Sequence, residues 1–190
     1  MKIAALVLAA GGSSRLGQPK QLVSFQGQTL IRHIVKTAAS AGCAPVVVVV
    51  GRDQQRIAAE LADLPVTILP NEKWEHGLGT SIRAGVAALP EVDAVIILAC
   101  DQPHVDETLL HRLMAEQHRT QRPMVGSSYA QTVGIPALFS SACFAKLLSL
   151  GDEEGAKSLL LSRPNETSTV AFAAGEIDLD TPNDLQRIAR

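Results

Sequence analysis

The sequence predicts an α/β fold: a three-layer, Rossmann-like, mostly parallel sheet with helices on both faces. Short continuous apolar runs at residues 3–8, 45–50 and 94–99 are typical of strands that are buried on both faces of a sheet. Segments with helical spacing of apolar residues separate these runs. Repeated β-α units of this kind favour a mostly parallel sheet covered by helices.

The remaining elements alternate in the same way. Asp53 and Asp106 stand where the caps of two helices are expected, with the first helix ending near residue 64. Residues 121–139 give a weaker pattern of short strand-like pieces. Further strands are predicted at residues 66–69 and 168–172, and further helices at residues 29–41, 79–89, 141–150 and 155–161, with a last helix opening at residues 181–184.

Composition limits the classes of function that are open to this chain. Its 190 residues, 46% of them hydrophobic, favour one domain spanning residues 1–190. The net charge of −2 supplies no basic field for nucleic acid or a membrane surface. No segment approaches the ~20 apolar residues of a membrane-spanning helix, and the apolar N-terminus fits a buried strand better than a signal peptide. The three cysteines are widely spaced, which argues against a disulfide framework, and the cytoplasm is the expected location.

A loop rich in small residues follows the first predicted strand. It consists of Leu8-Ala9-Ala10-Gly11-Gly12-Ser13-Ser14-Arg15-Leu16-Gly17-Gln18-Pro19-Lys20. Small residues let several backbone N–H groups converge on a polyphosphate, while Arg15 and Lys20 supply positive charge. Gly12 and Gly17 have the glycine spacing of a P-loop, but Gln18 stands where that motif has lysine. A plain strand-to-helix turn is the alternative, and it would leave both cations without a role. The predicted nucleotide-binding residues are Ala10, Gly11, Gly12, Ser13, Ser14, Arg15 and Lys20.

This loop resembles the LAAGxSxRxGxxK signature of the nucleotidyltransferases related to the enzymes that attach CMP or GMP to molybdopterin. The likeness extends over most of the chain and implies a fold like that of the nucleotide-diphospho-sugar transferases. It favours the cytidylyltransferase branch over the guanylyltransferase branch. Its further landmarks are Asn71-Glu72-Lys73-Trp74, residues 77–83, Ala99-Cys100-Asp101-Gln102-Pro103, residues 134–139, Gly151-Asp152, Gly155-Ala156-Lys157 and Asp178-Leu179-Asp180-Thr181-Pro182.

The resemblance also implies a Mg²⁺ site. In such enzymes an aspartate after a central strand binds the metal, and Asp101 matches it. A carboxylate at the carboxyl end of a parallel strand faces the ligand crevice, and Mg²⁺ usually takes one or two carboxylates together with phosphate oxygens and water. Asp180 is the expected second ligand and Asp178 is the alternative, although both fit solvated acids before a helix as well. Asp106 suits the cap of the next helix better than Asp101 does.

A second Gly-rich stretch, around residues 71–83, is expected to meet the nucleotide or the acceptor. Its backbone and hydroxyl groups, at the start of a predicted helix, suit an anion, a sugar or a base. The alternative is a Gly-rich loop with an ordinary helix cap. Trp74 is expected to pack, and Cys100 is expected to be a buried residue rather than a nucleophile. The predicted ligand-binding residues of this stretch are Gly79, Thr80 and Ser81.

These residues predict in-line attack by an acceptor phosphate on the α-phosphorus of an NTP, with release of pyrophosphate. Such a nucleophile is already ionised, so catalysis needs positioning and charge neutralisation by Arg15, Lys20 and Asp101. We expect the N-terminal half to bind the NTP and the C-terminal half to bind the acceptor. The resemblance implies CTP and molybdopterin as substrates, with a molybdoenzyme or its chaperone as protein partner. The alternatives are GTP as donor, a sugar or polyol phosphate as acceptor, and a non-catalytic protein that binds a nucleotide or a pterin.

Overall fold

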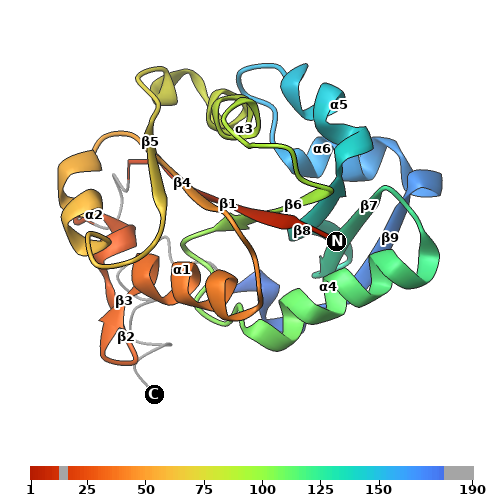
Figure 1. Ribbon diagram of the computed structural model, residues 1–190, viewed down its shortest axis with the longest axis horizontal. Coiled ribbons are helices and arrows are strands. Elements are labelled where there is room, and N and C mark those ends of the chain that lie inside the picture. Colours follow the sequence, from red (N-terminus) through yellow and green to blue (C-terminus); the bar gives the residue numbers. More distant parts are fainter. Residues whose placement is uncertain (13–16, 178–190) are drawn as a thin grey trace.

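The structure is a computed structural model of the chain and describes residues 1–12 and 17–177. A seven-stranded sheet with the order β5-β4-β1-β6-β8-β7-β9 forms its centre (Figure 1). β8 runs antiparallel to both of its neighbours, while β5, β4, β1 and β6 are parallel. The strands are β1 (Ile3–Ala9), β4 (Val46–Val50), β5 (Thr67–Pro70), β6 (Ala94–Ala99), β7 (Met124–Tyr129), β8 (Thr132–Ser140) and β9 (Thr167–Ala171).

Helices cover both faces of this sheet, which confirms the predicted three-layer fold (Figure 1). Successive side chains of a strand point to opposite faces, and β1 shows the result. Ala5 and Val7 belong to one hydrophobic core, whereas Leu6 and Leu8 belong to the other. The first core is closed by α1 (Leu30–Ser40), α2 (Gln54–Glu60) and α4 (Glu107–Thr120), and the second by α3 (Leu78–Ala87), α5 (Phe144–Leu148) and α6 (Ala156–Ser162).

Both predicted aspartates stand at the N-cap positions of their helices, but only one side chain makes the capping hydrogen bond. The backbone N–H of Leu109 donates a hydrogen bond to Asp106 Oδ1 over 2.7 Å, so Asp106 caps α4. The side chain of Asp53 makes no capping hydrogen bond to α2 in the described part of the chain. Its carboxylate lies 3.6 Å from the guanidinium of Arg56. The helix ends at Glu60, before the predicted residue 64.

The weakly patterned region becomes a long hairpin of β7 and β8. Its turn places Ala130 and Gln131 at positive φ angles of 45° and 59°, a conformation for which glycine or asparagine is the usual sequence signal. A bulge between Gly126 and Ser127 also breaks the alternation of the strand. The predicted helix at residues 141–150 is shorter than expected, because a 3-10 turn (Ser141–Cys143) precedes α5. A small hairpin, β2 (Ser24–Phe25) and β3 (Gln28–Thr29), was not predicted.

Two other predictions concern the last helix and the absence of a membrane-spanning helix. The last helix, expected from residue 181 onward, lies outside the described residues. No helix within residues 1–12 and 17–177 is long and apolar enough to cross a membrane.

Candidate active site

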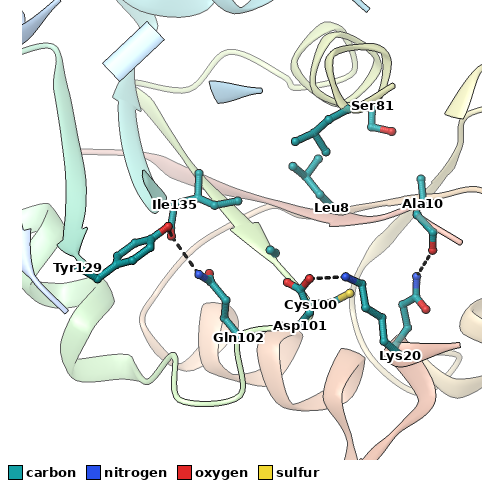
Figure 2. Close-up of a pocket in the computed structure, with 13 residues that line it drawn as sticks. Leu8, Ala10, Lys20, Ser81, Cys100, Asp101, Gln102, Tyr129 and Ile135 are labelled. Carbon is teal, nitrogen blue, oxygen red and sulfur yellow. Dashed lines mark hydrogen bonds and ion pairs between the residues drawn. The ribbon is translucent and has the colours of Figure 1, made fainter. Parts of the chain in front are cut away.

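A cavity of about 290 Å³ opens where the central strands β1 and β6 end. Its wall is built from the loops that follow these two strands, from the start of α3 and from β7 and β8. This is the edge of a parallel sheet at which ligands bind. Figure 2 shows Asp101 near the centre, with Lys20 and Ala10 to one side and Gln102, Tyr129 and Ile135 to the other. The cavity therefore has an end beside the Gly-rich loop and an opposite end beside the hairpin of β7 and β8.

An ion pair between Lys20 and Asp101 lies between these two ends (Figure 2). Lys20 opens the 3-10 helix η1 (Lys20–Leu22), directly after the Gly-rich loop, and Asp101 follows β6 at its carboxyl end. The Nζ of Lys20 donates to Asp101 Oδ2, and the two side chains are only 20% and 17% exposed. The structure thus brings together two of the predicted catalytic residues, 81 positions apart in the chain.

The carboxylate of Asp101 fits a metal ion that is bound together with a phosphate ligand. Within residues 1–12 and 17–177, no group of three or more histidine, cysteine, aspartate or glutamate residues is arranged to hold a metal. A carboxylate has about four lone-pair positions, so one lysine does not exhaust its capacity. Mg²⁺ often takes one or two carboxylates and completes its shell with phosphate oxygens and water. Among the described residues, Asp101 therefore offers one carboxylate to such an ion.

The predicted residues of the Gly-rich loop are only partly described. Ala10 and Gly11 line the cavity beside Lys20. Gly12 lies near the ring of Trp74. A Cβ built on Gly12 would be 3.4 Å from Trp74 Cη2. Five of the predicted site residues lie outside the described part of the chain: Ser13, Ser14, Arg15, Asp178 and Asp180.

A buried glutamine, missed by the sequence analysis, holds the start of this loop. Gln21 is 2% exposed, and its Nε2 donates to Ala9 O over 2.8 Å and to Gly11 O over 2.9 Å. Both amide hydrogens are thereby used on the backbone of the Gly-rich loop. Its Oε1 is buried and has no hydrogen-bond partner among the residues that the structure describes. Nothing in the pattern around Lys20 distinguishes Gln21 from an exposed glutamine.

In the second Gly-rich stretch, Gly79 and Thr80 make contacts within the fold, whereas Ser81 lines the cavity. The N–H of Gly79 donates to Asp152 O over 2.8 Å. The hydroxyl of Thr80 donates toward Gly77 O, over 2.8 Å, and is buried. Ser81 lines the cavity, and its Oγ accepts from Asn71 Nδ2 over 3.0 Å. Of the three predicted residues, Ser81 is therefore the one that faces the cavity.

We expect Gly79→Ala to destabilise the fold by about 1–3 kcal/mol, the usual cost of overpacking. A Cβ on Gly79 would collide with the carbonyl oxygen of Gly151, which is backbone and cannot rotate away. The measurement is the unfolding free energy from urea titration. Gly11→Ala is the matched control, because nothing lies within 4 Å of a Cβ at Gly11. Its stability should change by less than about 0.5 kcal/mol. Equal stability of the two variants would contradict the packing role of Gly79.

The cysteine beside Asp101 is buried, as the sequence predicts. Cys100 lines the cavity but is 3% exposed. Burial, with a smaller contribution from the charge of Asp101, raises the pKa of its thiol to about 12. The thiol therefore stays protonated at neutral pH, as a structural cysteine does.

At the opposite end of the cavity, the side chains of two residues donate to the same backbone carbonyl, that of Ile135. Gln102 Nε2 donates to Ile135 O over 3.3 Å, and so does the hydroxyl of Tyr129, also over 3.3 Å (Figure 2). Gln102 Nε2 also lies 3.4 Å from Gly175 O. The sequence analysis placed Gln102 in a landmark of the resemblance but assigned it no role. The contacts of its amide are with the backbone of Ile135 in β8 and of Gly175, both distant in the sequence.

Comparison with known protein families gives a match over most of the chain. The family described as "MobA-like NTP transferase domain" matches residues 5–167. The chain is 31% identical to "Purine catabolism protein PucB" of Bacillus subtilis, over 96% of this chain and 94% of that protein. It is 31% identical to "Probable molybdenum cofactor guanylyltransferase" of Bacillus cereus, over 92% of this chain and 85% of that protein.

Another curated relative is matched over a shorter stretch. "Nicotine blue oxidoreductase" of Paenarthrobacter nicotinovorans is 35% identical over 63% of this chain. The match spans 59% of that protein, which is less than two thirds of its length.

Solved structures confirm the fold class. Rv0371c from Mycobacterium tuberculosis H37Rv superposes with a TM-score of 0.85 at 28% identity, over 98% of this chain and 96% of that chain. The complex of Rv0371c with manganese gives a TM-score of 0.82 at 25% identity, over 99% of this chain and 98% of that chain. A divalent metal is therefore bound in a structural neighbour of this chain.

Proposed function

Since the chain belongs to the MobA-like NTP transferase family, we propose that it is a nucleotidyltransferase that moves CMP from CTP to the phosphate of molybdopterin and releases pyrophosphate. The observation that carries this proposal is the Lys20–Asp101 pair in a cavity beside the Gly-rich loop. A cation and a carboxylate held together at the ends of β1 and β6 are what a phosphate ligand and its metal require.

In this proposal the N-terminal half binds the nucleotide. The backbone around Ala10 and Gly11 approaches the triphosphate, with Ser13, Ser14 and Arg15 completing the loop. Lys20 neutralises phosphate charge as pyrophosphate leaves, because its ammonium is a compact point charge on a flexible stem. Ser81 lies across the cavity, within reach of the sugar or the base.

The proposed metal is Mg²⁺, held by Asp101 and by Asp180 as the second carboxylate. When bound, Mg²⁺ would supply charge neutralisation at the phosphates. The protein supplies the position of the carboxylate at the end of β6, and Lys20 keeps that carboxylate inside the cavity. The manganese complex of Rv0371c supports the use of a divalent ion in this family.

A second candidate has GTP as the nucleotide donor. It is favoured by the similarity to a protein named as a probable molybdenum cofactor guanylyltransferase, over 92% of this chain. The proposed chemistry and the roles of Lys20 and Asp101 are the same for either nucleotide. A molybdoenzyme or its chaperone remains the proposed protein partner that receives the product.

The test is release of pyrophosphate in the presence of Mg²⁺, with CTP, GTP, ATP and UTP compared, each with and without molybdopterin. We expect release with CTP that requires molybdopterin. Pterin-dependent release with GTP instead would support the second candidate. If no NTP is cleaved with molybdopterin although nucleotide binds, the proposed reaction is wrong, and sugar and polyol phosphates would be the next acceptors to test.

A further inference from the structure

The start of the Gly-rich loop is held through its carbonyl groups. Gln21 Nε2 donates to Ala9 O over 2.8 Å and to Gly11 O over 2.9 Å. Exchange of nitrogen and oxygen in this amide would set an oxygen against two carbonyl oxygens, so the hydrogen-bond network assigns the nitrogen to this side. Gln21 follows Lys20 directly in η1 and is 2% exposed. One short turn therefore carries both the lysine of the ion pair and the amide that holds the loop.

One of these two hydrogen bonds orients the peptide that joins Gly11 to Gly12. This peptide is trans, and the C=O and N–H groups of a planar trans peptide point in opposite directions. Because Gly11 O faces the amide of Gln21, the N–H of Gly12 points away from that amide. This N–H makes no hydrogen bond to another described residue. It is therefore available to a ligand of the loop.

Little else in the described structure restrains this peptide. Nothing lies within 4 Å of a Cβ built on Gly11. A peptide that turns over exchanges the directions of its C=O and N–H groups and moves the residue after it to positive φ. Gly12 is not at positive φ in the structure, but glycine adopts such angles without steric cost. The turned peptide would present the oxygen of Gly11 where the N–H of Gly12 now stands, and an oxygen repels a phosphate.

We propose that Gln21 is a positioning residue, which keeps the Gly11–Gly12 peptide from turning over and so directs the N–H of Gly12 at a phosphate of the nucleotide. This inference rests on the proposed function, because it takes the nucleotide triphosphate as the ligand of the loop. Both amide hydrogens of Gln21 are used on the loop itself. The side chain therefore acts through the backbone N–H, whose hydrogen bond to a charged oxygen is stronger than one to a neutral group.

The ring of Trp74 lies beside Gly12 and provides a reporter. A Cβ built on Gly51 would be 2.6 Å from Trp74 Cγ, so the pyrrole end of the ring occupies the space that Gly51 leaves open. At the other end of the ring, a Cβ on Gly12 would be 3.4 Å from Cη2, which is an ordinary contact. Alanine at position 12 therefore fits beside the ring. Trp74 is the only tryptophan in the sequence, so its fluorescence should respond to a ligand that binds at Gly12.

The first test measures nucleotide binding to Gln21→Met. Methionine keeps most of the length of the side chain but cannot donate a hydrogen bond to the loop. CTP and GTP are each titrated with Mg²⁺ and without an acceptor, and binding is followed by the fluorescence of Trp74. We expect the Kd of the nucleotide that the wild type binds better to rise by about 10-fold or more, the effect of losing one hydrogen bond to a charged group. An unchanged Kd would overturn the proposal.

Gln102→Met is the matched control for the loss of a buried glutamine. Gln102 is 4% exposed, and its Nε2 also donates to two backbone carbonyls, Ile135 O and Gly175 O, at the opposite end of the cavity. Both variants should be less stable than the wild type in urea, but only Gln21→Met should bind nucleotide more weakly. An equal loss of affinity in the two variants would reflect a loosened fold and would contradict a specific role of Gln21.

A second substitution separates turning of the peptide from a merely structural role. A residue with a Cβ resists positive φ, so Gly12→Ala disfavours the turned peptide. We expect the factor by which Gln21→Met weakens nucleotide binding to be about 5-fold smaller in the Gly12→Ala background than in the wild type, as the cost of positive φ for alanine implies. The stability lost with Gln21 should not return. Equal factors in the two backgrounds would overturn the proposal.

A measurement on the wild type decides the matter if Gln21→Met does not fold. The protein is labelled with ¹⁵N-glycine, and the amide resonance of Gly12 is assigned by its absence from the spectrum of Gly12→Ala. A hydrogen bond to phosphate should move this amide proton downfield and slow its exchange with water when CTP or GTP is added. An unmoved Gly12 resonance at saturating nucleotide would overturn the proposal.

These measurements do not depend on turnover. Nucleotide affinity that depends on Gln21 supports the proposal even if no pyrophosphate is released with molybdopterin and the proposed reaction fails. Equal affinity of Gln21→Met and the wild type overturns it even if the reaction is confirmed. The absence of saturable binding of CTP and of GTP to the wild type would overturn both the role of Gln21 and the nucleotide site itself.

Discussion

Replacement of Lys20 by methionine should lower the rate of pyrophosphate release by ~10²-fold or more, as the loss of one preorganised electrostatic donor does in other enzymes. The side chain of Lys20 is 20% exposed, and its ammonium is held in the cavity by Asp101. Low exposure makes its charge more effective than the same charge in water. Because methionine keeps most of the length of the unbranched side chain, the effect should come from the lost charge.

Steady-state kinetics would check this expectation, with Lys36→Met as the control. Lys36 lies exposed on α1 and is not one of the residues that line the cavity, so this variant loses the same formal charge outside the cavity wall. Its kcat and KM should match those of the wild type. If charge neutralisation develops mainly as pyrophosphate leaves, Lys20→Met loses kcat more than affinity for CTP. Near-normal kcat in Lys20→Met would remove the lysine from the mechanism.

The sequence predicted the fold class because its signals are local. A strand buried on both faces has no polar alternation, so β1, β4 and β6 appear as uninterrupted apolar runs. The bounds of β6, Ala94–Ala99, agree with the predicted residues 94–99. The hairpin of β7 and β8 was harder to predict, because Ala130 and Gln131 adopt positive φ angles without the usual turn residues.

The candidate site was predictable in part for the same reason. Asp101 closely follows one apolar run, and Lys20 ends the Gly-rich loop that follows another, so their position at one edge of the sheet follows from the order of elements. The roles of Gln21 and Gln102 were not predictable. Each depends on which backbone carbonyl lies opposite its amide, 10 positions away for Gly11 and 73 positions away for Gly175. The loop that packs on Gly79 comes from residues 151–154, and no local sequence pattern predicts that contact.

Asp101→Asn should raise the Mg²⁺ concentration for half-maximal rate by at least about 10-fold, since even residues that merely orient a metal ligand cost 10–100-fold in metal affinity. Asparagine keeps the shape of the side chain but loses the negative charge that a hard cation prefers. A Mg²⁺ titration of the rate measures the effect. Binding of Mn²⁺ in the presence of CTP, followed by electron paramagnetic resonance, measures it without turnover.

Asp106→Asn is the matched control for this variant. Asp106 is in the same loop after β6 but caps α4, and asparagine is as good a cap as aspartate. Its metal titration should therefore be that of the wild type. An unchanged titration in Asp101→Asn would exclude Asp101 as a ligand and would leave its ion pair with Lys20 as its only described role at the site.

The two substitutions should not be additive, because Lys20 and Asp101 are in direct contact. In the single variant Lys20→Met, the carboxylate of Asp101 stays in the cavity without its lysine. In Asp101→Asn, the ammonium loses the group that positions it. The double variant has neither an unpaired carboxylate nor an unpositioned ammonium. The factor by which its kcat/KM falls should therefore be smaller than the product of the factors for the two single variants. A product equal to the double loss would mean that the lysine and the carboxylate act on the phosphates independently and that their ion pair contributes nothing to catalysis.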